Sequence, residues 1–270
     1  MLLLHQHTVK LPTIEIPLST QITDNPKRAQ YFTDCIGALD GTHIAVHLPA
    51  SVQPRYRNRK HYLSQNVLAA CNFDMEFTYV LAGWEGSAHD STVLRDAQYN
   101  RGFKTPPKKY WLGDAGYSNS ETILVPYRGT RYHLKEQRLA GKKPENSKEL
   151  FNLRHSSLRN AIERIFGILK RKYHILQSPP EYSIDTQTRV IFACTALHNW
   201  VRFSEGDRAD ILLESESTLG KKVQDIQPAI VYPEGAITSK KMDAFRDQLA
   251  EKMWADYQRY LYNSNTIEED

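Results

Sequence analysis

The sequence predicts an α/β fold, with a mixed sheet flanked by helices and a C-terminal helical extension. Two observations predict it. Short apolar runs bounded by turn residues occupy the first half of the chain, as is typical of strands. Longer segments with apolar residues every three or four positions follow, which indicates helices. A chain of 270 residues is long enough for one large core with an appendage, or for two small domains.

The strands come first along the chain, and most of the helical residues follow them. Strands are expected at 36–48, 66–73, 77–84, 110–113 and 122–125, the first being one strand or a tight pair. The second and third are expected to form a hairpin, because only Asp74-Met-Glu76 and the flanking residues join them. Helices are expected at 91–97, 146–173, 185–203 and 239–262.

The helix expected at 146–173 has a defined start and a defined buried face. Asn146 and Glu149 have the spacing of a capping box, in which the cap side chain and the third residue bond reciprocally to backbone amides. At 100° per residue, the apolar positions gather within about 60° of Ile165. These positions are Leu158, Ala161, Ile162, Ile168 and Leu169.

The chain divides into four segments. Residues 1–34 are expected to be irregular, because Pro12, Pro17 and Pro26 interrupt any helical period. Residues 35–203 form the main domain, and residues 204–238 read as an acidic, serine-rich linker. The helix at 239–262 is amphipathic and is expected either to fold back on the core or to form the seam of a homo-oligomer. Its apolar residues are Met242, Phe245, Leu249, Met253, Tyr257 and Leu261.

Charge is unevenly distributed. From residue 205 onward there are 8 Lys and Arg against 14 Asp and Glu, whereas the preceding residues carry a net charge of +10. A basic body suits a polyanionic partner, although uneven surface charge without a partner is an equally good explanation. No stretch approaches the roughly 18 apolar residues that a membrane span needs. Three cysteines, an odd number without metal-ligand spacing, indicate reduced intracellular thiols.

Four carboxylates stand in distinctive local settings. Asp40 and Asp114 lie on short apolar runs that predict strands. For Asp40 the structural alternative is a hairpin turn, since Asp-Gly is a strong hairpin signal. For Asp114, in Gly-Asp-Ala-Gly, the alternative is a turn residue at the end of a strand. Asp90 precedes the helix at 91–97, where it is expected to be the N-cap. Glu163 lies about 160° from Ile165 on the helix, so its alternative is a solvated side chain on the polar face. Two strand aspartates and a helix glutamate are also the set that holds divalent metal against a phosphodiester.

Five strings occur in the order found in one family of proteins. They are Ala38–Ile44, Trp84–Ser91, Leu112–Tyr117, Arg159–Arg171 and Ala196–Asn199. Together they resemble the catalytic domain of the PIF/Harbinger transposases, including the Harbinger transposase-derived nucleases. The resemblance covers roughly residues 35–203.

The resemblance implies an RNase H-like fold with a DDE metal site. On that template Asp40, Asp114 and Glu163 are the catalytic carboxylates, and all three bind metal together with Asp90. Oxygen ligands suit Mg²⁺ or Mn²⁺ rather than zinc. The implied function is a metal-dependent DDE endonuclease that cleaves phosphodiester bonds of DNA.

Basic residues near these motifs are expected to contact DNA. Phosphate contacts supply affinity without reading sequence, and the aromatics of the loop at 54–62 could stack on unpaired bases. An ordinary solvated basic loop is an equally good explanation for that segment. The expected nucleic-acid-binding residues are Arg55, Arg57, Arg59, Lys60, Arg159, Arg164, Lys170 and Arg171.

Two other functions are open at this stage. The chain is alternatively a catalytically inactive domesticated transposase that serves as a DNA-binding or protein-interaction module. A hydrolase of small phosphate esters is less favoured, because no glycine-rich phosphate loop is present. The segment before the first motif shows no helix-turn-helix pattern, and the resemblance implies a separate Myb-like DNA-binding protein as a partner. Substrate and family imply a nuclear location, with the cytoplasm as a second location, and no membrane association.

Overall fold

The computed structural model describes residues 2–15, 17–130, 143–205 and 239–267. Its strands are β1 (Cys35–Ala45), β2 (Ser64–Cys71), β3 (Phe77–Glu85), β4 (Tyr110–Leu112) and β5 (Ile123–Leu124). Its longer helices are α5 (Asp90–Asn100), α7 (Ser147–Lys172), α8 (Ile184–Glu205) and α10 (Lys240–Ile267). Its short helices are α1 (Leu2–Thr8), α2 (Thr20–Thr23), α3 (Pro26–Ala29), α4 (Gln53–Tyr56) and the 3₁₀ turn η1 (His174–Leu176).

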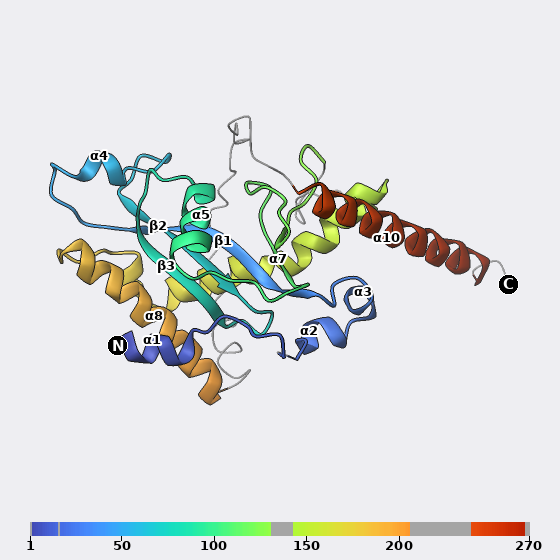
Figure 1. The fold of residues 1–270 in the computed structure, drawn as a ribbon, viewed down its shortest axis with the longest axis horizontal. Coiled ribbons are helices and arrows are strands. Elements are labelled where there is room, and N and C mark those ends of the chain that lie inside the picture. The colour runs from blue at the N-terminus through green and yellow to red at the C-terminus, as the bar shows by residue number, and fades with distance from the viewer. Residues whose placement is uncertain (1, 16, 131–142, 206–238, 268–270) are drawn as a thin grey trace.

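The five strands form one mixed sheet in the order β3-β2-β1-β4-β5. The pairs β1–β2 and β2–β3 are antiparallel, and β2 and β3 form the predicted hairpin. The pairs β1–β4 and β4–β5 are parallel. This arrangement, with helices around a mixed sheet, is the predicted RNase H-like α/β fold (Figure 1).

Both faces of the sheet are buried. Alternate residues of β2 point to opposite sides, as a strand requires. Val67 and Ala69 belong to a large apolar cluster that includes residues of α7, α8 and α10. Leu68 and Ala70 belong to a second cluster that includes residues of α5. The α5 helix therefore covers one face, and α7 and α8 cover the other, as Figure 1 shows.

Helix α7 starts and packs as the sequence predicts. Its N-cap is Asn146, whose side chain accepts a hydrogen bond from the Glu149 amide at 2.9 Å. The Glu149 carboxylate accepts in return from the amide of Glu145, one residue before the cap, at 3.0 Å. The predicted buried face is confirmed, with Ile162 and Ile165 completely inaccessible. The cap and the apolar stripe together fix the rotation of α7 about its axis.

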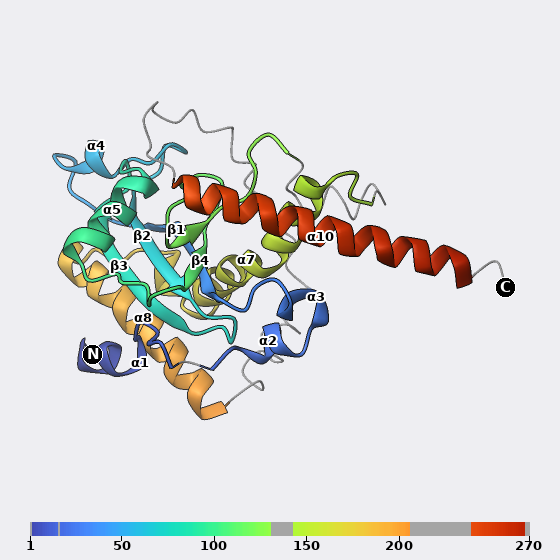
Figure 2. The ribbon, with the colours of Figure 1, turned by 45° about the vertical axis from the view of Figure 1, so that its right-hand side comes forward.

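Helix α10 packs along α7 with its N-terminal part and extends past the body with its C-terminal part (Figure 2). Met242, Leu249 and Met253 are buried in the large core. Tyr31 and Tyr127 donate hydrogen bonds to Asp256 and Asp247 of α10, at 2.7 and 2.6 Å. Core packing is therefore the correct alternative for this part of the helix, which ends at Ile267 rather than 262.

The first 34 residues differ from the prediction of irregular structure, because they contain α1, α2 and α3. Pro26 begins α3, where a missing amide hydrogen costs nothing. Ser19 and Asn25 cap the two short helices with their side-chain oxygens. The linker expected at 204–238 lies almost entirely outside the described residues. In the described part of the chain, no helix is long and apolar enough to cross a membrane.

Candidate metal-dependent active site

Asp40 lies in the middle of the central strand rather than in a turn. It pairs with Ala69 across the antiparallel β1–β2 ladder, so the hairpin alternative is wrong. Its Oδ1 accepts a hydrogen bond from the Gly41 amide at 2.8 Å, and its Oδ2 accepts one from Arg159 Nη1 at 3.0 Å. Burial raises the pKa of the carboxyl to about 7; Arg159 lowers this pKa, and Asp114 and Asp90 raise it further.

Asp90 lies directly against the strand residue that follows Asp40. The N-cap of α5 is His89, and its side chain makes no capping hydrogen bond, so the predicted cap role of Asp90 is wrong by one position. As the first helical residue, Asp90 instead accepts a hydrogen bond at Oδ1 from Asn66 Nδ2 at 2.6 Å. A Cβ atom on Gly41 would lie only 2.6 Å from Asp90 Oδ1. The absence of a side chain at Gly41 thus creates the space for this carboxylate.

We expect Gly41→Ala to weaken Mn²⁺ binding by more than about tenfold, because the new methyl group would displace the Asp90 carboxylate. Calorimetric titration of the metal-free protein measures this. Gly167→Ala is the matched control, since its Cβ would meet only the end of the flexible Arg171 side chain at 3.2 Å. Unchanged Mn²⁺ affinity in Gly41→Ala would remove Asp90 from the site.

Asp114 follows the short strand β4 through Gly113. Since Leu112 pairs with Ala38 in the parallel β1–β4 ladder, the end of β4 lies beside Asp40. Asp114 also makes a turn, because its Oδ2 and its carbonyl accept hydrogen bonds from the amides of Gly116 and Tyr117 at 3.2 and 3.0 Å. Asp114 therefore is a turn residue, as the structural alternative predicted, and it also lies near Asp40.

The hydroxyl of Tyr117 belongs to the same cluster and was not predicted. The residue is 2% exposed, and its oxygen has no hydrogen-bond partner among the described residues. Burial raises the pKa of this phenol well above its ordinary value, and Asp90, Asp40 and Asp114 raise it further. All three aspartates therefore lie close enough to this buried hydroxyl to affect its pKa. No local pattern in Gly-Asp-Ala-Gly-Tyr marks this tyrosine as different from an ordinary core residue.

Glu163 is linked to Asp40 by hydrogen bonds from Arg159. It lies one turn after Arg159 on α7, and its side chain is 51% exposed, as expected for the polar face. Arg159 donates from Nη2 to Glu163 Oε1 and from Nη1 to Asp40 Oδ2. Its own side chain is only 7% exposed. The sequence places Arg159 on the open face with Glu163, whereas the fold encloses it between two carboxylates.

The donor set fits a hard divalent cation in its chemistry. Asp40, Asp90 and Asp114 supply carboxylate oxygens, which Mg²⁺ and Mn²⁺ prefer. Nearby, Asn66 Oδ1 is a buried acceptor without a hydrogen-bond partner in the part of the chain that the structure describes. Over the same residues, no three Asp, Glu, His or Cys side chains are gathered closely enough to hold one ion together. The guanidinium of Arg159 lies between Asp40 and Glu163 instead.

Some of the predicted DNA-contacting residues lie around this cluster. Arg59 contacts His89 Nδ1 at 2.6 Å, next to Asp90. The charges of Asp90, Lys170, Lys60 and Arg59 all act on the His43 imidazole, whose pKa burial lowers. Lys170 donates to Thr42 Oγ1 and to the His43 carbonyl at 2.8 and 2.9 Å. These three cations therefore surround the edge of the site that carries Asp90.

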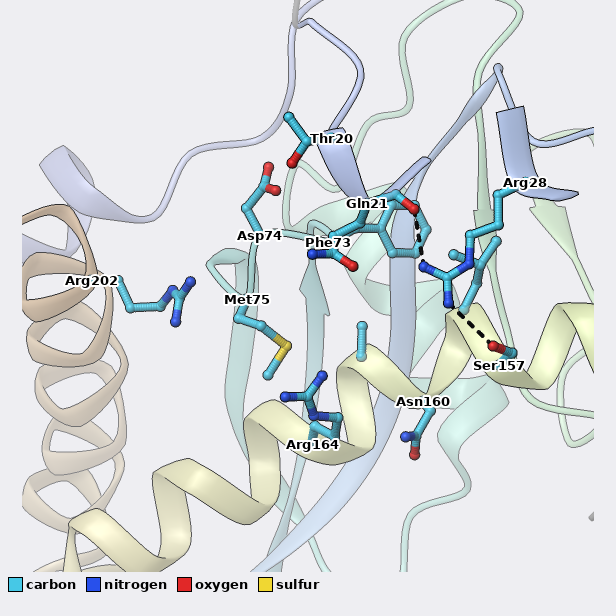
Figure 3. A pocket seen from close by; sticks show the side chains of 12 residues that line it. Thr20, Gln21, Arg28, Phe73, Asp74, Met75, Ser157, Asn160, Arg164 and Arg202 are labelled. Carbon is cyan, nitrogen blue, oxygen red and sulfur yellow. Dashed lines mark hydrogen bonds between the residues drawn. The ribbon is translucent and has the colours of Figure 1, made fainter. Parts of the chain in front are cut away.

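The other predicted basic residues are distributed more widely. Arg55 pairs with Glu85, and Arg57 donates to the His61 carbonyl at 2.8 Å. Arg171 is exposed and lies near Gly167, one turn beyond Glu163. Arg164 projects from a different face of α7 and lines a pocket of about 230 Å³ with Arg28 and Arg202 (Figure 3). The residues that line this pocket include none of the four carboxylates.

Comparison with known proteins agrees with this geometry. The family described as DDE superfamily endonuclease matches residues 39–199, which include all four carboxylates. An Arabidopsis thaliana protein named "Protein ALP1-like" is 29% identical over 199 residues, which cover 66% of this chain and 45% of that protein. A Rattus norvegicus protein named "Putative nuclease HARBI1" is 30% identical over 170 residues, or 61% of this chain and 45% of that protein.

The Homo sapiens protein of the same name is 27% identical over 170 residues. No solved structure matches the chain. The chain spans about half the length of the curated relatives it matches. The family match covers more than half of the chain. Apart from Ala38, the matched region contains the sequence strings that resemble the PIF/Harbinger transposases. The chain therefore belongs to the DDE superfamily endonuclease family, in its Harbinger transposase-derived branch.

Proposed function

We propose that this protein is a divalent-metal-dependent nuclease that cleaves phosphodiester bonds of DNA. Asp40, Asp114 and Glu163 are the catalytic carboxylates in this proposal, and Asp90 is a fourth metal-associated residue. The observation that supports it best is that Asp90 and Asp114 both lie close enough to act electrostatically on the buried Asp40 carboxyl, since placing like charges together is costly without a cation. Bound Mg²⁺ or Mn²⁺ would supply activation of a water or 3′-hydroxyl and stabilisation of the leaving oxygen.

The chain's own residues have distinct tasks in this proposal. Asp40 presents its oxygens from the middle of β1, and Asp114 presents its oxygens from just past the end of β4. The two strands are parallel neighbours and are rigid supports. Asn66 orients the Asp90 carboxylate through its amide hydrogen bond. Lys170, Arg59 and Lys60 bind phosphates flanking the scissile bond. Nicking of supercoiled plasmid in the presence of Mn²⁺, and its absence in EDTA, tests the function.

A second candidate is the catalytically inactive DNA-binding or protein-interaction module. One observation favours it: Arg159 already pairs with Asp40 and Glu163, so part of their negative charge is balanced without metal. In that case the protein binds DNA equally well in EDTA and in Mn²⁺ and cleaves in neither. The DNA substrate leads us to propose a nuclear location, and the family resemblance leads us to propose a Myb-like DNA-binding partner. Co-purification from nuclear extract would test both.

We expect the double variant Arg59→Gln, Lys60→Gln to weaken DNA binding and to flatten its salt dependence. Each phosphate contact contributes about 0.9 to the slope of log affinity against log salt, so the slope should fall by about two. Fluorescence anisotropy at several salt concentrations measures the slope. Arg164→Gln is the control, because Arg164 lies on a different face of α7. A loss of slope in Arg164→Gln alone would place the DNA against the face of α7 that carries Arg164.

A further inference from the structure

Arg159 places a permanent positive charge inside the carboxylate site. Arginine stays protonated in proteins, and its planar fork suits two acceptors at once. Here one branch, Nη1, binds Asp40 Oδ2 at 3.0 Å, and the other, Nη2, binds Glu163 Oε1. Because the Arg159 and Asp40 side chains are only 7% and 22% exposed, solvent screens the interaction between them only weakly. The two carboxylates proposed to share a metal therefore already share a cation.

Both oxygens of the Asp40 carboxylate have hydrogen-bond partners in the metal-free protein. The other oxygen of Asp40 accepts the Gly41 amide hydrogen bond at 2.8 Å, so both of its oxygens are engaged. His155, one turn before Arg159, is completely buried and donates from Nε2 to the Leu124 carbonyl at 3.0 Å, which holds this part of α7 against the sheet. A metal ion bridging Asp40 and Glu163 would stand next to the guanidinium and be repelled by it.

We propose that Arg159 is a built-in counter-ion of the metal-free site, which competes with the divalent cation for Asp40 and Glu163. This inference rests on the proposed metal-dependent function. In the metal-free protein Arg159 offsets the repulsion among buried carboxylates. When metal binds, the guanidinium must release at least one of its two partners, and the cost of that release weakens metal binding. Arg159 is thus a positioning residue. It cannot keep both of its contacts with the carboxylates while the metal is bound to them.

Calorimetric titration of Mn²⁺ into EDTA-stripped full-length protein tests the competition. We expect Arg159→Gln to bind Mn²⁺ at least about tenfold more tightly than the wild type, since hydrogen bonds to charged groups no longer have to be broken. Arg159→Lys keeps the charge and should stay within a few-fold of the wild type. Arg189→Gln removes a charge from an exposed arginine on α8 and should leave the affinity unchanged. Equal or weaker binding by Arg159→Gln, or no binding by either protein, overturns the proposal.

Thermal unfolding provides a second and independent readout of the competition. In EDTA, Arg159→Gln should unfold at a lower temperature than the wild type, because Asp40 then lacks a counter-charge. Mn²⁺ should raise the unfolding temperature of Arg159→Gln more than that of the wild type. A smaller or equal rise contradicts the competition. Neither experiment uses DNA, so both are independent of the test for cleavage. If the wild type cleaves DNA but Arg159→Gln gains no affinity for Mn²⁺, this inference is wrong and the proposed nuclease function is unaffected.

Discussion

Asp114→Asn is expected to abolish Mn²⁺-dependent DNA cleavage while leaving DNA binding intact. The substitution removes the negative charge but keeps an oxygen that can accept the Gly116 amide hydrogen bond, so the turn after β4 should survive. Changing an outer-shell partner of a metal commonly costs 10- to 100-fold, and a direct ligand should cost more than about 100-fold. Plasmid nicking measures cleavage, and fluorescence anisotropy in EDTA measures binding.

The matched control for this experiment is Asp34→Asn. Asp34 is a half-exposed aspartate just before β1 that pairs with Lys109 at 2.9 Å, away from the cluster. This variant should cleave like the wild type. If Asp114→Asn also cleaved normally, its carboxylate would be a turn residue and nothing more. Loss of DNA binding together with cleavage would instead indicate a structural role, and cleavage by neither variant nor the wild type would favour the inactive module.

A large pH dependence of stability is expected from Asp40 in the metal-free protein. Its pKa is about 7 in the folded chain against an ordinary value of 3.8. The folded state therefore keeps a proton that the unfolded state has lost, and stability falls as the pH rises from about 4 through 7. At about 1.36 kcal/mol per pH unit, the penalty above pH 7 reaches at most roughly 4 kcal/mol. The partial exposure of the side chain, 22%, reduces it.

The pH effect of Asp40 has to be separated from that of His155. Burial lowers the pKa of His155 to about 3, so His155 destabilises the fold progressively as the pH falls below 6.5. The quantity to measure is therefore the difference in unfolding free energy between the wild type and Asp40→Asn, by urea denaturation in EDTA. This difference should move in favour of Asp40→Asn between pH 4 and pH 8. A difference independent of pH would mean that burial and the neighbouring carboxylates do not raise the pKa of Asp40 in the folded protein.

The sheet and the main helices follow from local sequence patterns, and their physical origin is clear. The apolar positions of α7 recur at the period of a helix, and Asn146 with Glu149 marks its start, so both its limits and its buried face were predictable. The strands β2 and β3 are apolar runs joined by a short turn. The short helices α2 and α3 were less predictable, because their side-chain caps at Ser19 and Asn25 outweigh the nearby prolines.

The site was only partly predictable, for reasons that concern tertiary structure. Asp-Gly at 40–41 carries the same local signal in a hairpin and in a central strand; pairing of β1 with both β2 and β4 decides between them. A helical wheel places Arg159 beside Glu163 but says nothing of the strand that encloses it. Tyr117 joins the cluster through the fold of the turn after β4, and no spacing in the sequence marks it.

We propose that the carboxylates around Asp40 form a divalent-metal site. Titration of Mg²⁺ or Mn²⁺ into the purified protein by calorimetry tests it most directly, with Asp40→Ala as the comparison. We predict binding of millimolar affinity or tighter in the wild type and its loss in Asp40→Ala. A wild type indifferent to both metals, or equal binding by Asp40→Ala, would contradict the claim and leave the non-catalytic module as the better account of this fold.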